Sequence, residues 1–151
     1  MHNESLFESL SITGAPKIVT TPPGPKSREI LEQQAAYESS AVSYSKGMPM
    51  ALERGKGATL VDVDGNVYID FFGGAGVMAL GHGHPVVLEA AHAQIDKVTH
   101  SLDIPTETRL KLVESLRGVL PKELSRLFFG GPTGSDAVEQ ALKLAKFNTG
   151  R

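Results

Sequence analysis

The sequence predicts an α/β fold, because segments with strand patterns and segments with helix patterns alternate along the chain. Two observations carry this prediction. Residues 59–64 and 66–71 are rich in β-branched and aromatic residues, and they flank Asp64-Gly65-Asn66, a strong signal for a hairpin turn. Residues 124–129 form a short apolar run, and a glycine-rich turn leads from it into a helical pattern at residues 136–146.

Composition describes an ordinary globular chain of 151 residues, about one domain in length. Net charge is −2, so no basic excess indicates binding to nucleic acid or to an anionic membrane. The absence of cysteine excludes a disulfide framework and a thiolate zinc site. The first residues lack the pattern of a secretory signal, and no apolar run approaches the roughly 20 residues of a membrane span. We therefore expect a soluble cytoplasmic protein.

The amino-terminal residues predict an arm that is followed by a short helix. Residues 1–26 contain several prolines and glycines among polar residues, which favours a flexible or polyproline-like arm. Residues 27–37 are the helix candidate, with Ser27 as its N-cap.

Strands are expected between Met50 and Phe72. Within this segment, Asp62 and Asp70 invite an interpretation as a pair of carboxylates for acid–base catalysis. Aspartates beside turns more often face water or cap a neighbouring loop. We prefer this second interpretation.

Residues 72–81 are a glycine-rich apolar loop, which suits a segment that is both buried and close to another group. They do not form a dinucleotide-binding fingerprint, because Gly74-Ala75-Gly76 lacks the third glycine and the strand-to-helix transition. The next residues, His82 and His84, provide only half of a metal site, and no third ligand is evident. We therefore predict no metal and expect the histidines to shape the loop and the helix entry.

Two amphipathic helices follow this loop. Pro85 is a favourable first helical residue, and apolar residues at 87, 91, 95 and 98 form a stripe after it. Thr106 is the expected N-cap of the second helix, which should end at Pro121. Its apolar residues are expected to face inward: Leu112, Val113, Leu116 and Leu120.

The turn at residues 130–134 is the strongest candidate for a binding site. It holds three glycines and one proline between the apolar run and the last helix. The first N–H groups of a helix have no internal partner, and the helix dipole adds about half a positive charge there. The backbone N–H groups of Gly134 and Ser135, with the hydroxyls of Thr133 and Ser135, could therefore hold a phosphate group.

The same residues allow a purely structural interpretation. Asp136 and Glu139 have the spacing of a capping box, and Ser135 is an equally good cap. The carboxylate of Asp136 would also stand where an anion would sit, so a phosphate requires this side chain to turn away. Local pattern leaves both interpretations open.

Three segments resemble the class III aminotransferases, which use pyridoxal 5'-phosphate. Residues 131–146 are similar to that family's Ser-Gly-(Ser/Thr)-Glu-Ala-Val-Glu segment, residues 62–71 to its Asp-x-Asp-Gly segment, and residues 81–85 to its Gly-His-x-His-Pro segment. The segments occur in the family's order and at about its spacing. The Gly-Pro-Thr-Gly form at 131–134 and the Pro-Gly-Pro-Lys at 23–26 are closer to diaminobutyrate and 4-aminobutyrate type members.

This resemblance implies the amino-terminal third of a fold type I transferase of the pyridoxal-phosphate-dependent class, so the α/β fold would be incomplete. Residues 1–26 would be a flexible arm, and residues 27–105 would be a small-domain segment with a β-hairpin and an active-site loop. Residues 106–151 would begin the large cofactor-binding domain with its first strand and helix. Exposed apolar surface is expected as a result.

The resemblance also implies a reaction and a cofactor. The complete enzyme would be a homodimer that moves an amino group from an ω-amino donor to a 2-oxo acid such as 2-oxoglutarate. Pyridoxal 5'-phosphate would be held by Thr133, Gly134 and Ser135. The substrate side of the pocket would be lined by residues of the glycine-rich loop: Ala75, Gly76, Val77 and Met78.

No catalytic residue is expected within the chain. In the resembled family, the lysine that bonds to the cofactor and the aspartate that pairs with the pyridine ring lie beyond the equivalent of Arg151. Lys143 and Lys146 are not substitutes, because both lie on the exposed side of a helix and a catalytic lysine needs a lowered pKa. We expect the chain alone to be inactive. The alternative is a non-catalytic phosphate-binding or structural module.

Overall fold

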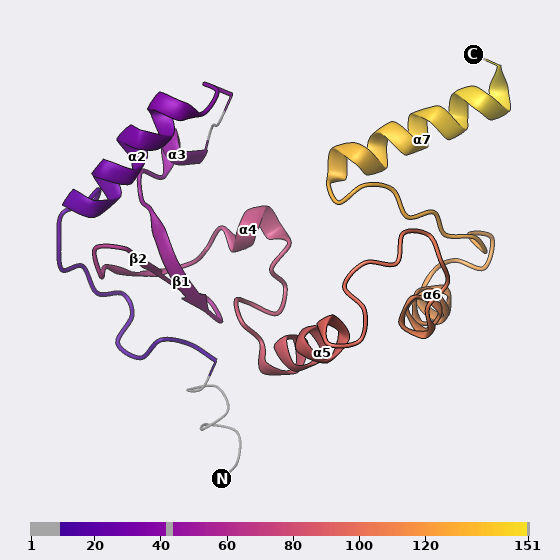
Figure 1. Ribbon diagram of the computed structural model, residues 1–151, viewed down its shortest axis with the longest axis horizontal. Coiled ribbons are helices and arrows are strands. Elements are labelled where there is room, and N and C mark those ends of the chain that lie inside the picture. Colours follow the sequence, from indigo (N-terminus) through magenta and orange to yellow (C-terminus); the bar gives the residue numbers. More distant parts are fainter. Residues whose placement is uncertain (1–9, 42–43, 151) are drawn as a thin grey trace, which may run out of the picture. The chain divides into compact units, whose positions relative to one another are not determined.

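The computed structural model describes residues 10–41 and 44–150, which divide into two compact units, Met1–Thr99 and His100–Arg151 (Figure 1). Residues 1–9 of the predicted arm lie outside the described residues. The first unit contains α2 (Pro25–Tyr37), α3 (Tyr44–Gly47), β1 (Leu52–Lys56), β2 (Thr59–Asp62), β3 (Val67–Ile69), α4 (Gly73–Gly76) and α5 (Pro85–Ile95). The second unit contains α6 (Glu107–Val119) and α7 (Gly134–Thr149).

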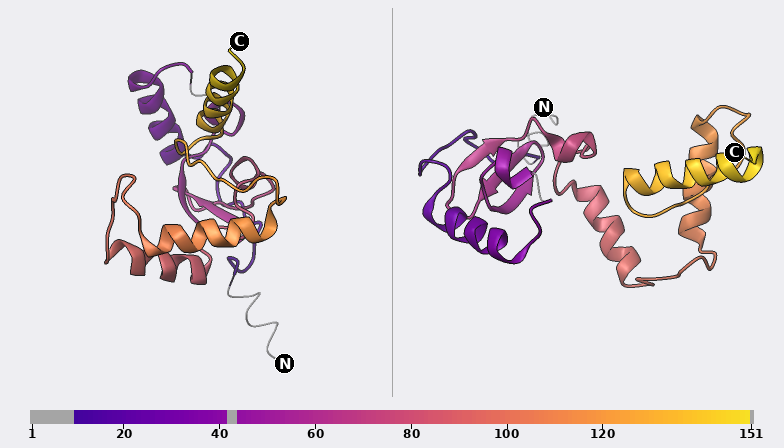
Figure 2. Two further views of the ribbon diagram at one scale, coloured as in Figure 1. Left: turned by 90° about the vertical axis from the view of Figure 1, so that its right-hand side faces the viewer. Right: turned by 90° about the horizontal axis from the view of Figure 1, so that it is seen from above.

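The first unit is built on an antiparallel sheet with the strand order β1-β2-β3 (Figure 2). Strands β2 and β3 form the predicted hairpin, with Val61 opposite Val67 and Thr59 opposite Ile69. Gly65 adopts a φ of 88° in the connecting turn, a conformation that glycine reaches without strain. The sheet confirms the α/β prediction for this part of the chain.

The centre of this unit is polar. Among the described residues, Val61 is the one buried hydrophobic side chain, while Asp62 and Asn66 are fully buried. The Oδ1 atom of Asp62 accepts from the N–H groups of Asp64 (3.0 Å) and Asn66 (2.8 Å). Its Oδ2 atom accepts from Nδ2 of Asn66 and from the hydroxyl of Tyr68, both at 2.8 Å. Asp62 therefore caps the turn from inside and is shielded from water.

These hydrogen bonds set the protonation of both partners. Burial acts to raise the pKa of Asp62, but the hydrogen bonds from Asn66, Tyr68 and the backbone outweigh it and lower that pKa below its usual value. Burial, together with the hydrogen bond to Asp62, raises the pKa of Tyr68 to about 12. The pair is consequently an anionic acceptor and a neutral donor at neutral pH.

The segment before α2 is fastened to the outer edge of β3. Lys17 and Val67 exchange backbone hydrogen bonds of 2.9 and 2.7 Å. The Oδ1 atom of Asn66 then accepts from the N–H groups of Val19 and Thr20, both at 2.8 Å. Residues 17–20 thus follow the hairpin because Lys17 pairs with Val67 and one buried amide side chain satisfies the backbone donors of Val19 and Thr20.

Helix α2 begins earlier than predicted, and Ser27 is not its N-cap. The helix starts at Pro25, after Gly24. The first N–H groups are instead satisfied by Asp64 of the hairpin turn, which accepts from Lys26 (2.9 Å) and Ser27 (2.8 Å). Burial acts to raise the pKa of Asp64, and the hydrogen bonds from Ser27 and Lys26 outweigh it, so the pKa is lowered. A cap supplied from a distant turn leaves no local sequence signal.

Replacing Gly24 with alanine should destabilise this junction. A Cβ atom at Gly24 would lie 2.3 Å from Cγ of Asp64, so the carboxylate would have to leave the helix terminus. We expect the free energy of unfolding to fall by about 1–3 kcal/mol, the usual range for overpacking, as measured by urea denaturation with circular dichroism. Gly47→Ala is the control, because nothing lies within 4 Å of a Cβ there. Equal midpoints for the two variants would contradict the assigned contact.

The second unit consists of two helices joined by an extended segment. Figure 1 shows α6 end-on and α7 from the side, so their axes are strongly inclined. The prediction that Thr106 caps α6 is confirmed, since its Oγ1 atom accepts from the N–H of Arg109 at 3.2 Å. The strand expected at residues 124–129 is not formed: nothing within the described ranges pairs with this segment, and a strand requires a neighbour. Phe129 is instead covered by the guanidinium of Arg109, 5.0 Å from its ring centroid.

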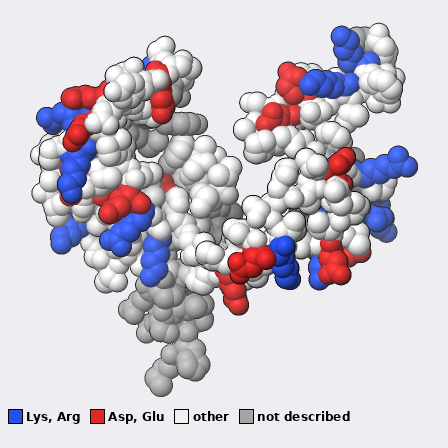
Figure 3. Space-filling model, in the orientation of Figure 1, with Lys and Arg blue, Asp and Glu red and all other residues white. Residues whose placement is uncertain are grey.

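Apolar side chains remain exposed on the three longer helices after the sheet, as expected. The stripe predicted to face inward on α6 is only partly covered, since Leu112 is 47% exposed while Val113 and Leu116 are intermediate. On the face in Figure 3, acidic and basic side chains are interspersed among the other residues. No helix in the described part of the chain is long and apolar enough to cross a membrane.

Candidate functional site

The candidate phosphate site is the amino terminus of α7. Thr133 is the N-cap, with extended backbone (φ −110°, ψ 159°), and its Oγ1 atom accepts from the N–H of Asp136 at 3.2 Å. The Oδ2 atom of Asp136 accepts in return from the N–H (3.0 Å) and the hydroxyl (2.7 Å) of Thr133. The capping box therefore joins Thr133 and Asp136, and the expected box of Asp136 and Glu139 is wrong. The helix begins at Gly134, so Asp136 occupies its third position.

This capping box divides the three predicted phosphate ligands into two kinds. The N–H and hydroxyl of Thr133 are both engaged by Asp136. The N–H groups of Gly134 and Ser135 are the first two of the helix, and no group within residues 10–41 and 44–150 accepts from them. Nothing lies within 4 Å of a Cβ built on Gly134. Two adjacent donors on exposed residues fit a phosphate oxygen.

The protonation of Asp136 matters for this fit. Its hydrogen bonds from Thr133, first from the side chain and then from the backbone, lower the pKa of Asp136 below its usual value. The side chain is thus a carboxylate at neutral pH, turned toward Thr133. An anion bound by Gly134 and Ser135 would have to approach on the side away from this carboxylate.

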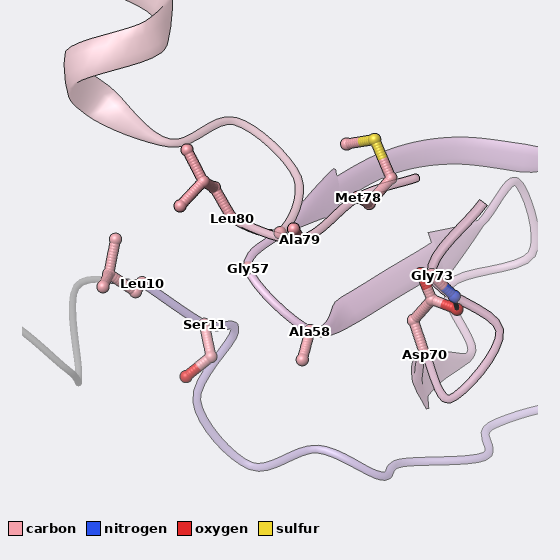
Figure 4. Close-up of a pocket in the computed structure, with 10 residues that line it drawn as sticks. Leu10, Ser11, Gly57, Ala58, Asp70, Gly73, Met78, Ala79 and Leu80 are labelled. Carbon is pink, nitrogen blue, oxygen red and sulfur yellow. Dashed lines mark hydrogen bonds between the residues drawn. The ribbon is translucent and has the colours of Figure 1, made fainter. Parts of the chain in front are cut away.

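The predicted substrate residues lie on the loop that follows β3. Ala75, Gly76, Val77 and Met78 are all exposed. A pocket of about 490 Å³ lies at the base of this loop (Figure 4). Met78 lines it together with Gly57, Asp70 and Gly73, whereas Ala75, Gly76 and Val77 do not. The structure therefore places one of the four predicted residues at a pocket.

A hydrogen bond that no sequence pattern indicated joins the segments 62–71 and 81–85. The Nε2 atom of His82 lies 2.8 Å from Oδ2 of Asp70, twelve residues earlier. Asp70 thus binds a loop and a histidine, which fits its interpretation as a capping residue. No group of three or more potential metal ligands occurs within the described residues.

The two lysines of α7 have surroundings that do not suit a nucleophile. Lys143 forms an exposed ion pair with Glu139 at 3.7 Å, and both side chains are more than half exposed. Lys146 is also exposed, near the end of the helix. Neither environment provides the burial that a catalytic lysine needs.

Comparison with known proteins decides the family. The family profile described as aminotransferase class-III matches residues 40–151, which is well over half of the chain. This chain belongs to the class III aminotransferase family. The match includes all three segments on which the resemblance was based, and it contains both the glycine-rich loop and the capping box of α7.

Several curated relatives of this family member are diaminobutyrate enzymes. The diaminobutyrate–2-oxoglutarate aminotransferase of Haemophilus influenzae is 40% identical over 82% of the chain and 28% of its own length. The diaminobutyrate–2-oxoglutarate transaminase of Virgibacillus pantothenticus is 44% identical over 76% of the chain and 29% of its own length. An alanine/serine racemase of Pyrococcus horikoshii is 39% identical over 90% of the chain and 29% of its own length. The chain thus spans less than a third of these relatives, and they differ in reaction.

Solved structures confirm the fold of this part of the family. An omega-transaminase from Sphaerobacter thermophilus superposes with a TM-score of 0.72 at 29% identity, over 86% of this chain and 30% of that chain. A transaminase with pyridoxal phosphate bound superposes with a TM-score of 0.69 at 28% identity, over 80% and 29%. The prediction of a transferase fold of the pyridoxal-phosphate-dependent class is therefore confirmed, except for the strand expected at residues 124–129.

Proposed function

We propose that this chain is the amino-terminal part of a pyridoxal-phosphate-dependent aminotransferase that transfers an amino group from an ω-amino donor to a 2-oxo acid such as 2-oxoglutarate. The observation that carries the proposal is the pair of N–H groups at Gly134 and Ser135, two exposed residues of a family motif, which donate to no described group. The relatives from Haemophilus influenzae and Virgibacillus pantothenticus support diaminobutyrate as the donor and 2-oxoglutarate as the acceptor.

The chain contributes binding and orientation of the cofactor. The N–H groups of Gly134 and Ser135 and the hydroxyl of Ser135 hold the phosphate, aided by the positive end of α7. Thr133 acts through its capping box with Asp136, which fixes the direction in which the two donors point. Once bound, pyridoxal phosphate supplies an electron sink for bonds at the amino carbon of the substrate.

The remaining parts of the proposal concern the complete enzyme. Residues 27–105 belong to its small domain, and residues 106–151 begin the large domain. Ala75, Gly76, Val77 and Met78 line the substrate side. The complete enzyme is a cytoplasmic homodimer.

The purified 151-residue chain should not catalyse transamination. None of its described lysines has the surroundings of a cofactor-binding nucleophile, as Lys143 and Lys146 illustrate. With 2,4-diaminobutyrate, 2-oxoglutarate and added pyridoxal phosphate, we expect glutamate to form at the rate of the free cofactor alone. Coupled glutamate assay is the measurement. A rate above the cofactor-only blank that scales with protein concentration would contradict the proposal.

The alternative is a non-catalytic phosphate-binding or structural module, and ligand binding separates these two forms of it. Titration of the chain with pyridoxal phosphate should shift the amide resonances of Gly134 and Ser135 in ¹H–¹⁵N spectra. Inorganic phosphate tests whether the site recognises the phosphate alone. Absence of any shift with either ligand would favour a purely structural role.

A further inference from the structure

The glycine-rich loop at residues 72–81 is attached at both ends to the turn between β1 and β2. Before the loop, the N–H of Asp70 donates to the carbonyl of Ala58 at 2.8 Å. After the loop, His82 and Gly57 exchange backbone hydrogen bonds of 2.9 and 2.7 Å. The two ends of the loop are therefore held side by side by two consecutive residues, as in a closed surface loop.

A side-chain hydrogen bond closes the same base. Oδ2 of Asp70 lies 2.8 Å from Nε2 of His82, and Oδ1 accepts from the N–H groups of Phe72 (3.0 Å) and Gly73 (2.8 Å). The Asp70 side chain is only 5% exposed. The hydrogen bond from His82 and then that from Gly73 lower the pKa of Asp70, so a carboxylate is available to all three donors.

The ring of His82 has its own fixed place on the sheet. A Cβ atom built on Gly55 of β1 would lie 2.7 Å from Cγ of His82, so the ring packs directly over that glycine. The ring is thus held by the strand below it, by its own backbone pairing, and by Asp70.

The loop itself has a conformation that its glycines accept but that Ala75 does not favour. Residues 73–76 have φ values of 54°, 61°, 62° and 85°, a left-handed turn in which Ala75 is the one residue with a side chain. Non-glycine residues persist in this region only where the surroundings fix the backbone. The first residue of the turn, Gly73, is bound by Asp70. Figure 4 shows Asp70 and Gly73 together on one side of the pocket at the loop base.

We propose that Asp70 and His82 are positioning residues for the substrate loop: their hydrogen bond holds the left-handed turn at 73–76, and so fixes how residues 75–78 meet the substrate. This inference rests on the proposed function, because it takes these four residues as the substrate wall. Asp70 and His82 act through the loop backbone and do not touch the substrate.

The first test measures loop order in the full 151-residue chain. His82→Ala should speed amide exchange at Gly73 by about tenfold or more, since a charge-assisted hydrogen bond at the loop base is lost. It should also lower the ¹⁵N order parameters of residues 73–80 while exchange at Val61 and Asn66 in the hairpin stays slow. His82→Gln, which can donate to Asp70, should restore part of the protection. His92→Ala, at an exposed position of α5, is the matched control.

Asp70→Asn guards against a variant that fails to fold, because its amide oxygen can still accept from Gly73 while the interaction with His82 is weakened. Increased motion confined to the loop in His82→Ala supports the inference, and the same result in Asp70→Asn supports it if His82→Ala does not fold. Unchanged loop order in a folded His82→Ala chain overturns it. Loss of hairpin protection in both His82→Ala and Asp70→Asn also overturns it, because the hydrogen bond would then stabilise the whole unit.

The second test separates the loop from the proposed function. In the complete enzyme, His82→Ala should raise KM for the amino donor by about tenfold with kcat changed less than about threefold, because binding geometry rather than chemistry is disturbed. His82→Gln should bring KM for the amino donor back close to the wild-type value. A fall in kcat as large as the rise in KM overturns the positioning role. Activity of the wild-type enzyme in the same assay upholds the proposed function. An inactive wild-type enzyme refutes the proposed function, and with it the substrate role of the loop.

Discussion

Asp62→Ala should lower the free energy of unfolding of the first unit by about 3–5 kcal/mol, because several buried donors lose one acceptor and each unsatisfied donor costs about 1–3 kcal/mol. The donors are the N–H groups of Asp64 and Asn66, Nδ2 of Asn66 and the hydroxyl of Tyr68. Urea denaturation with circular dichroism is the measurement. The substitution should also bring the pKa of Tyr68 down from about 12 toward its ordinary value of 10.0, which absorbance titration detects.

Glu32→Ala is the control for this experiment. Glu32 is an exposed acidic residue of α2, so the same change in charge removes no buried acceptor. We expect its unfolding free energy to stay within about 0.5 kcal/mol of the wild type. If Asp62→Ala behaved like Glu32→Ala, the hairpin would not depend on the buried carboxylate.

Gly134→Val should weaken retention of pyridoxal phosphate in the complete enzyme by about tenfold to a hundredfold. The expectation follows from the loss of one or more charge-assisted hydrogen bonds, each contributing about 1.5–3 kcal/mol. A Cβ atom added at this position meets nothing within 4 Å beyond its chain neighbours and the backbone of its own helix. The described residues therefore offer no clash with that atom that would account for a loss of affinity. Cofactor absorbance remaining after dialysis gives the result.

Gly118→Val is the matched control for Gly134→Val. Gly118 also lies on a helix with nothing within 4 Å of a built Cβ, but it is near the end of α6 and belongs to no candidate site. Its cofactor content should equal that of the wild type. If the two variants retained equal amounts of cofactor, the phosphate would not be bound at residues 133–135.

Local signals in the sequence predicted what is determined locally. The Asp64-Gly65-Asn66 turn, the Thr106 cap and the helix start at Pro85 all depend on neighbouring residues, and the structure confirms each. The three proposed phosphate ligands do lie on one helix terminus. That they bind a phosphate remains a prediction.

Features that depend on distant partners could not be predicted in this way. Ser27 has the residue type of an N-cap, but Asp64 takes this role from across the fold. The apolar run at 124–129 has the composition of a strand, but composition cannot provide the neighbour that a strand needs. The capping box of Thr133 and Asp136 has the same spacing as the pair Asp136 and Glu139, so spacing could not distinguish the two. The extended backbone of Thr133 makes this residue the N-cap.

The link between Asp64 and α2 has a consequence for biosynthesis. Synthesis runs from the amino terminus, so Lys26 leaves the ribosome before Asp64, which follows it by 38 positions, and the helix emerges ahead of its capping carboxylate. Short helices without tertiary support are marginal in water. During translation, α2 therefore gains lasting structure only after the hairpin has left the exit tunnel and closed.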